Sequence, residues 1–265
     1  MSKNPFEKPI KREEPPIKEM EKKLDKAEKM VEEVEKRWKD KIEEFEMVEK
    51  SVKELKKLWE ENEEEVRKEM SWDDIFSFIS SLPLPEVPSS LLERISNKFL
   101  KEFDWKKFKG RYFLENDLGL FLSAFLKKNI ENYISSQKEK GVKEKNIKPI
   151  EVRLRVKELP IVLDFLGYQN LKKLHLIIEG DCGSWTGDRM RGGKIIVKGN
   201  CRYDTGRYMQ GGELNVKGET ESFDKSAFSP NNKGAIIWKR TKIWENGNWT
   251  KEGKEMWERG EILVG

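Results

Sequence analysis

Hydrophobic side chains recur at alternating spacings of three and four along residues 17–70, and this segment contains neither glycine nor proline. The pattern fills the a and d positions of a heptad and is typical of a coiled coil, because it lays one apolar stripe along a helix. A lone helix would leave such a stripe in water, so the segment needs a partner. The predicted seam residues are Leu24, Val31, Trp38, Phe45, Val52 and Trp59.

The nature of this partner stays open. Lys41 and Asn62 occupy d positions, where polar residues often fix the register of a coiled coil at some cost in stability. Trp38 and Trp59 are bulky for a two-stranded seam, which favours an antiparallel or higher-order arrangement, or packing on another domain. We expect an intermolecular coiled coil, and the alternative is a single charged helix lying along the rest of the protein.

The segments on either side of this helix have different patterns. Residues 1–16 are polar and contain four prolines, which predicts a flexible arm. Residues 71–149 predict a small helical module. Capping-box spacing places helix starts at Ser71 and Ser90, and a third helix is expected to begin near Asn116 or Asp117.

Residues 150–265 show strand-like alternation and an internal repeat. A 19-residue unit begins at Gly180 and begins again at Gly199 and Gly218. A short fixed period with glycines in register marks a solenoid, in which each turn stacks on the next. The repeated glycines suit corners that need positive φ or a close backbone approach. The repeat residues are Gly180, Gly183, Gly187, Met190, Gly192, Gly193, Gly199, Gly206, Met209, Gly211, Gly212 and Gly218.

Apolar residues one repeat apart are expected to stack inside the solenoid. A three-residue insertion before Gly234 lengthens the third loop. The open ends need covers, for which the helices before residue 150 and the aromatic tail after residue 240 are candidates, the latter with a hairpin at Asn246 and Gly247. The predicted stacks are Leu176, Ile195, Leu214 and Ile236; Ile178, Val197, Val216 and Trp238; and Met190 with Met209.

The repeat resembles the GXGXG-repeat family, whose pattern is G-x-x-G-x-x-x-G-x-x-M-x-G-G-x-I-x-V-x-G. The unit from Gly180 to Gly199 matches throughout, and the next departs at Arg202 and Leu214. The resemblance covers residues 150–240 and implies a right-handed β-helix, as in the glutamate synthase large subunit and in one subunit of formylmethanofuran dehydrogenase. In those enzymes the β-helix is structural and the redox cofactors lie on other domains. The family pattern therefore brings no catalytic or cofactor-binding residue to this chain.

Two kinds of side chain in the repeat region could carry chemistry. Cys182 and Cys201 lie one turn apart, and we expect buried, reduced, stacked thiols. A rung spacing of about 4.8 Å also makes a disulfide geometrically conceivable, so their bonding stays open. His175 is the single histidine and alternates with Leu174 and Leu176, so we expect it to face outward without a catalytic role.

Charged residues gather at the corners of the repeat. We expect solvated side chains and ion pairs there, and the alternative is an anion or metal site. No catalytic, cofactor-binding or metal-binding residue is predicted, and no cofactor. The corner residues are Asp181, Asp188, Asp204, Arg189, Arg191 and Arg207.

Composition narrows the class of protein. Charged residues make up 38% of the chain, the formal net charge is +4, and the abundance of Lys and Glu resembles that of heat-adapted proteins. The N-terminal segment lacks an apolar core and no apolar run approaches the ~20 residues that cross a bilayer, so we expect a cytoplasmic protein with no membrane contact.

A basic region in the middle of the chain suggests a further partner. Residues 97–157 contain 16 Lys and Arg against 8 Asp and Glu. Trp105, Phe108, Tyr112 and Phe113 are interleaved with basic residues there, an arrangement that could stack bases and contact phosphates. Because no nucleic-acid-binding motif is present, nucleic acid is the weaker alternative.

Together these patterns predict an α+β fold. It comprises a coiled-coil helix at 17–70, a helical module at 71–149 and a right-handed parallel β-helix of about four turns with its cap at 150–265. We expect a non-catalytic oligomeric scaffold, joined through the coiled coil to further copies or to a protein partner. An accessory structural subunit of a redox complex, implied by the family resemblance, is the alternative.

Overall fold

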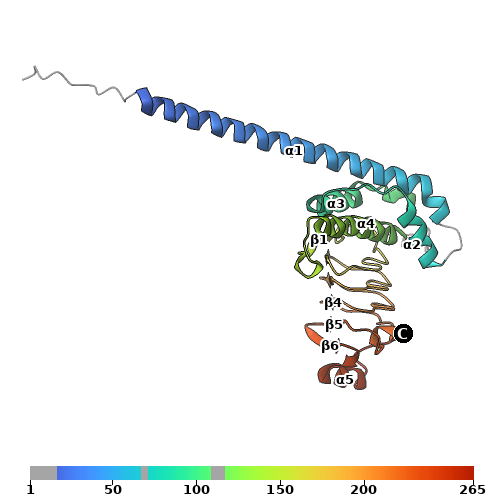
Figure 1. Ribbon diagram of the computed structural model, residues 1–265. Coiled ribbons are helices and arrows are strands. Elements are labelled where there is room, and N and C mark those ends of the chain that lie inside the picture. The colour runs from blue at the N-terminus through green and yellow to red at the C-terminus, as the bar shows by residue number, and fades with distance from the viewer. Residues whose placement is uncertain (1–16, 67–70, 109–116) are drawn as a thin grey trace, which may run out of the picture. The chain divides into compact units, whose positions relative to one another are not determined.

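The computed structural model describes residues 17–66, 71–108 and 117–265, and it has the predicted α+β architecture (Figure 1). A long N-terminal helix is followed by shorter helices and then by a parallel β-solenoid of about four turns. The predicted arm at residues 1–16 lies outside the described residues. Contacts divide the chain into Met1–Glu46 and Met47–Gly265, so the boundary lies inside the first helix rather than at residue 70.

Helix α1 (Ile17–Val66) contributes its C-terminal part to the core of the second unit. Val52 is 2% exposed and Trp59 4% exposed. The indole of Trp59 packs edge-on against Phe103 and Phe121, with ring centroids 6.1 and 5.5 Å away. This corrects the expectation that Val52 and Trp59 face a partner chain, because the helical module of the same chain buries them.

Three further helices form the helical module: α2 (Trp72–Ser81), α3 (Leu92–Glu102) and α4 (Asp117–Glu139). Ser71 caps α2 as predicted, because its hydroxyl oxygen accepts the backbone N–H of Asp74 at 3.3 Å. This bond satisfies one of the four N–H groups that lack a partner at a helix start. Short 3₁₀ turns occupy Ser89–Leu91, Trp105–Phe108, Glu144–Asn146 and Lys225–Phe228.

The predicted capping box at Ser90 is wrong. Helix α3 has Leu91 at its N-cap, with no side-chain capping bond. The carboxylate of Glu93 instead accepts the backbone N–H of Arg153 at 3.2 Å. The Glu93 side chain, which the capping box requires, is therefore engaged in a tertiary hydrogen bond instead.

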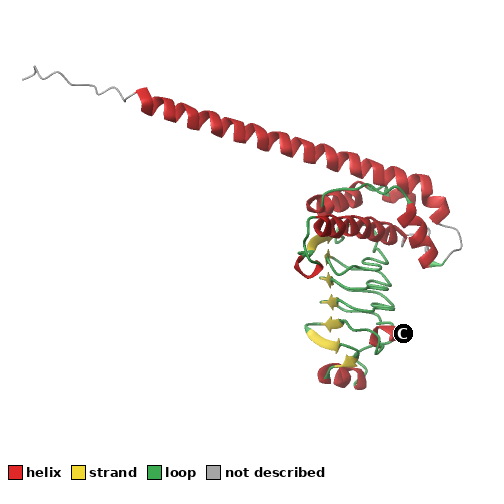
Figure 2. Ribbon diagram, in the orientation of Figure 1, coloured by secondary structure: helices red, strands yellow, loops and turns green. Residues whose placement is uncertain are grey.

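Parallel strands one per turn form the ladder of the solenoid (Figure 2). Leu176 pairs with Ile195, and Ile195 pairs with Leu214, so like residues lie directly above one another. Both predicted strand stacks are confirmed, because every member is at most 4% exposed. The strands are β1 (Ile150–Arg155), β2 (Leu174–Glu179), β3 (Lys194–Val197), β4 (Glu213–Val216) and β5 (Ala235–Trp238).

The solenoid contains a turn that the glycine repeat did not reveal. Strand β1 pairs with β2 so that Val152 lies opposite Leu176, a step of 24 residues instead of 19. Gly167 has φ +76° and takes the corner conformation that Gly187 and Gly206 adopt in later turns, at φ +72° and +76°. The first turn thus keeps one corner glycine, Gly167, and other residues replace the remaining glycines of the repeat pattern.

Non-glycine residues at the corners also adopt left-handed conformations. Trp185 has φ +57° and Arg189 has φ +53°. Such backbone is costly for residues that carry a Cβ, and it persists where the surroundings determine it. Here the N–H groups of Trp185 and Arg189 bond to the carbonyls of Tyr203 and Arg207 on the next turn, at 3.0 and 2.7 Å.

Helix α3 covers the outer edge of β1, the first strand of the sheet. Asn97 donates from Nδ2 to the carbonyl of Arg153 at 2.6 Å and accepts the N–H of Arg155 on Oδ1 at 2.8 Å. Together with Glu93, it satisfies backbone groups that another rung would otherwise bind. An exposed strand edge invites pairing with further chains, and these side chains block it.

The other end of the solenoid closes with an antiparallel hairpin. Strand β6 (Thr241–Glu245) pairs with β5 and with β7 (Asn248–Trp249). Asn246 and Gly247 have φ +51° and +86°, as the two central residues of a type I′ turn require. Helix α5 (Lys251–Glu258) lies beyond β6, while α2, α3 and α4 lie at the β1 end (Figure 1). The predicted covers at both ends are confirmed.

Candidate functional site

A row of large apolar side chains lies exposed on α1 ahead of the second unit. Each member is between 50% and 63% exposed, although apolar surface is favourably removed from water. Large exposed apolar patches mark interaction sites. We call this set the apolar row, and its members are Met20, Leu24, Met30, Val31, Val34, Trp38, Ile42 and Phe45.

The apolar row departs from the predicted heptad at one point. Lys41 occupies the expected d position, and its Nζ lies 5.8 Å from the ring centroid of Trp38. The neighbouring Ile42 is apolar and 54% exposed, so it continues the row between Trp38 and Phe45. Four of the predicted seam residues therefore belong to an exposed face, whereas the other two are buried in the core.

A buried ion pair occupies one corner of the solenoid. Asp188 is 0% exposed, and Arg207 on the next turn donates to its Oδ2 from Nε and Nη2, at 3.0 and 2.6 Å. Burial raises the pKa of Asp188 to about 6 despite the adjacent guanidinium group. The expected ion pair is thus present at this corner, but the expectation of a solvated side chain is wrong for Asp188. Aromatic rings cover the pair, because the guanidinium of Arg207 lies 5.8 Å from the ring of Trp185 and 5.5 Å from that of Tyr208.

The same corner binds helix α2. Arg189 forms an ion pair with Asp73 of α2 at 2.7 Å. The Tyr168 hydroxyl donates to the other carboxylate oxygen of Asp73 at 2.5 Å. Burial, with this hydrogen bond, raises the pKa of Tyr168, so its hydroxyl keeps the proton that it donates. These polar groups join the helical module to the solenoid.

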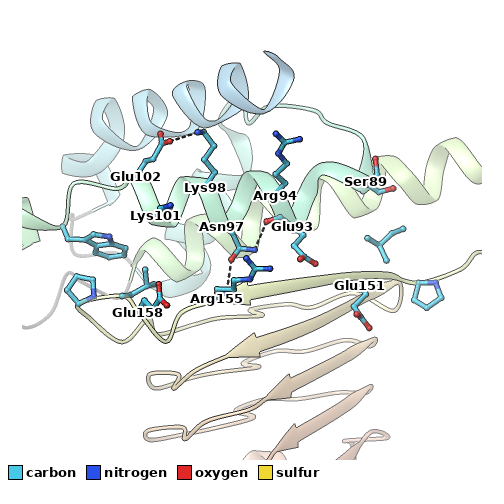
Figure 3. A pocket seen from close by; sticks show the side chains of 16 residues that line it. Ser89, Glu93, Arg94, Asn97, Lys98, Lys101, Glu102, Glu151, Arg155 and Glu158 are labelled. Carbon is cyan, nitrogen blue, oxygen red and sulfur yellow. Dashed lines mark hydrogen bonds and ion pairs between the residues drawn. The ribbon is translucent and has the colours of Figure 1, made fainter. Parts of the chain in front are cut away.

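A groove of about 1070 Å³ lies between α3 and β1 (Figure 3). Both basic and acidic side chains line it, among them Lys101, Arg155, Glu151 and Glu158. The mixture of charges gives the groove no single sign. It therefore offers no electrostatic preference for an anionic or a cationic ligand.

Two charged residues that line this groove, Lys98 and Glu102, form ion pairs with neighbouring side chains. Lys98 bridges Glu102 and Glu49 at 2.7 and 3.0 Å. These hydrogen bonds raise the pKa of Lys98, with Glu102 making the larger contribution, and Lys98 lowers the pKa of Glu102. A general acid or base works best with a pKa near the working pH. The pKa values of Lys98 and Glu102 are instead shifted away from neutral pH, so both side chains stay charged and form a permanent ion pair.

The two thiols lie inside the solenoid, where they are free and buried as predicted. Cys182 is 1% exposed and Cys201 3% exposed. Burial raises the pKa of Cys182 well above its usual value, so the thiol stays protonated at neutral pH. A protonated, buried thiol is a poor nucleophile.

We therefore expect the native thiols to react with Ellman's reagent at least a hundredfold more slowly than free cysteine at pH 8. After unfolding in guanidinium chloride, both should react at once. A Ser135→Cys variant, which places a thiol at an exposed position of α4, serves as the reactive control. Rapid modification of native Cys182 or Cys201 would contradict a closed solenoid interior.

The remaining candidate residues do not converge on a site. His175 is partly exposed between the buried Leu174 and Leu176, and burial lowers its pKa. Within the described residues, no three His, Cys, Asp or Glu side chains are placed to hold a metal ion. In the same part of the chain, every helix is too short or too polar to cross a bilayer.

Of the aromatic residues in the basic region, Trp105 has a described side chain, which is packed against the hydrophobic core. Trp105 packs against Phe103 with a ring distance of 4.9 Å and donates from Nε1 to the carbonyl of Leu100 at 3.1 Å. Tyr112 and Phe113 lie outside the described residues. The face of Trp105 is thus engaged in packing.

Sequence reasoning missed two members of the apolar row, Met30 and Ile42. A signal for Ile42 was present, because Met20, Val31 and Ile42 recur at a spacing of 11 residues. An 11-residue repeat follows the face of a straight helix more closely than a heptad does.

No protein-family model, curated protein or solved structure matches this chain. The resemblance of the repeat to the GXGXG family stays a prediction. Any function must therefore be argued from the apolar row, the corner ion pairs and the covered solenoid.

Proposed function

We propose that the protein is a non-catalytic oligomeric scaffold whose copies associate through the apolar row, while the solenoid presents a rigid surface. The observation that carries the proposal is the row itself, in which eight large apolar side chains are 50–63% exposed on one helix. Helices in water keep such a stripe only when another surface covers it. Residues beyond Met47 do not need a second chain, because Val48, Val52 and Leu55 are at most 2% exposed.

The covered ends of the solenoid support association through the helix. Glu93 and Asn97 occupy the edge of β1, and the β6–β7 hairpin follows β5. A solenoid that assembled end to end would need open edges. Association through the apolar row is therefore favoured over stacking of solenoid ends.

Sedimentation of the full-length protein tests the proposal. We expect a concentration-dependent oligomer at micromolar concentration. A Val31→Glu substitution should raise its dissociation constant at least thirtyfold, about 2 kcal/mol, because the oligomer would bury an unpaired carboxylate. Circular dichroism of the variant should show unchanged helix content, since Val31 is 55% exposed in the single chain.

The matched control is Lys36→Glu, which adds negative charge to the same helix. Lys36 is exposed and lies on the side of α1 opposite Val31, five residues away. Its substitution should change the dissociation constant less than threefold. A full-length protein that stays monomeric at tens of micromolar, or equal weakening by both substitutions, would refute self-association through the apolar row.

A further inference from the structure

We infer that two copies of the chain pair through residues 20–45 in antiparallel orientation, with the bulky Trp38 of one copy opposite the small Ala27 of the other. The inference rests on the proposed self-association and adds its geometry. Opposing residue numbers then sum to 65 or 66. The four layers are Met20 with Phe45, Leu24 with Ile42, Ala27 with Trp38, and Val31 with Val34, each formed twice by symmetry.

The spacing of the residues in the four layers supports this pairing. From Met20 through Leu24 and Ala27 to Val31 the steps are four, three and four, and from Phe45 back through Ile42 and Trp38 to Val34 they are three, four and four. The stripe therefore reads nearly the same in both directions, so an antiparallel copy meets it over its whole length. A two-fold axis perpendicular to the helices would pass between residues 32 and 33.

The sizes of the side chains distinguish the two orientations. In a parallel, in-register pair each residue meets its own copy, so Trp38 would face Trp38 and Ala27 would face Ala27. One layer would then be overfilled and another would hold a void, and both faults are destabilising. Antiparallel pairing places each Trp38 over an Ala27, so neither the overfilled layer nor the void forms.

The position of Lys41 is compatible with this pairing and favours neither orientation, because Ile42 rather than Lys41 continues the apolar row. In the antiparallel pair Leu24 of the second copy meets Ile42, while the Lys41 ammonium lies against the indole of its own Trp38. A long lysine side chain can cover apolar surface in this way and keep its charge in water.

The charged residues beside the row favour neither the parallel nor the antiparallel orientation. Antiparallel pairing brings Lys23 near Glu44 of the second copy, but it also brings Glu28 near Glu35. Parallel pairing would bring Lys23 near Glu28. Exposed ion pairs contribute little compared with the packing of core layers, so the layers decide.

The apolar row is large enough for a stable pair. Its eight members are each 50–63% exposed, and together they offer apolar area comparable to the ~800 Å² that each partner buries in a specific interface of standard size. An antiparallel pair also places the two residue-47 ends at opposite ends of the paired segment, ~44 Å apart, because residue 47 lies level with residue 18 of the other copy.

Cysteine cross-linking of the full-length chain tests the orientation. Met20→Cys and Phe45→Cys variants are prepared separately, mixed under conditions that allow exchange, and oxidised with diamide. We expect a cross-linked dimer on a non-reducing gel in the mixture, at least tenfold above either variant alone. The unsubstituted protein is the control for Cys182 and Cys201, which are buried.

The outcomes separate this inference from the proposed function. Cross-linking of each variant with itself would show a parallel pair, because residues 20 and 45 lie ~37 Å apart along a helix. That result would overturn the antiparallel inference and leave self-association intact. A protein that sediments as a monomer and forms no cross-link in any sample would overturn both.

Discussion

Replacing Arg207 with methionine is expected to lower the free energy of unfolding by about 4 kcal/mol at pH 7.5. Arg207 donates two hydrogen bonds to Asp188, whose side chain is 0% exposed. Removing one member of a buried pair leaves an uncompensated charge, which typically costs about 3–5 kcal/mol. The other oxygen of Asp188, Oδ1, has no hydrogen-bond partner among the described residues, so the carboxylate has no alternative donor there. Equilibrium unfolding in guanidinium chloride measures the loss.

The solenoid offers a matched control for this experiment. Lys198 pairs with Glu179 at 2.5 Å across the same one-turn step, but the two side chains are 44% and 31% exposed. Exposed ion pairs contribute about 0–1 kcal/mol, so Lys198→Met should cost less than 1 kcal/mol. Equal losses in the two variants would show that burial of Asp188 has no energetic consequence, contrary to the corner geometry described above.

The effect of Arg207→Met should also depend on pH. In the folded protein the pKa of Asp188 is raised from 3.8 to about 6, so the folded state holds this proton more tightly than the unfolded chain. The resulting stabilisation is present below about pH 4 and is lost as the pH rises through 6. Without Arg207 the pKa rises further. The loss of stability relative to wild type should therefore shrink between pH 7.5 and pH 5, whereas the Lys198→Met difference should stay constant.

Sequence could predict the solenoid because its signal is repeated. The glycines from Gly180 to Gly218 and the stacked aliphatic residues report the same period, and each turn confirms the last. The first turn escaped because its step is 24 residues and Gly167 is the sole corner glycine that it keeps. The 19-residue period is lost in this turn, which packs against the helical module, so periodicity could not predict it.

Burial of individual polar groups could not be read from the repeat. Asp188 follows a corner glycine, a position that is usually solvated, and what buries it is the approach of Arg207 and two aromatic rings. The heptad pattern likewise could not show that α1 becomes buried in the chain's own core from about Met47 onward, since the same spacing suits a second chain and the chain's own core. Burial of these residues depends on which surfaces of the protein pack together, and the periodicity of the sequence does not indicate which surfaces do.

Replacing Gly119 with alanine is expected to destabilise the protein by about 3 kcal/mol, although alanine is the better helix former. A Cβ at this position of α4 would lie 1.7 Å from the backbone oxygen of Asp164. The obstacle does not yield readily, because Asp164 Oδ1 accepts the N–H of Ser184 at 2.6 Å. One turn along the helix, Ser123 donates to the carbonyl of Phe165 at 3.0 Å. Helix α4 must therefore move away from the first turn of the solenoid, and overpacking of this kind costs about 1–3 kcal/mol or more.

A Ser135→Ala substitution separates this packing effect from helix propensity. Ser135 is exposed on the same helix, so its replacement should stabilise α4 by a few tenths of a kcal/mol. Thermal unfolding should then show a lower midpoint for Gly119→Ala and an unchanged or higher midpoint for Ser135→Ala. Because the helical module covers the β1 edge through Glu93 and Asn97, displacement of α4 should also increase amide hydrogen exchange at Arg153 and Arg155. A Gly119→Ala protein as stable as wild type would mean that α4 does not seat against the solenoid as closely as the 1.7 Å approach requires.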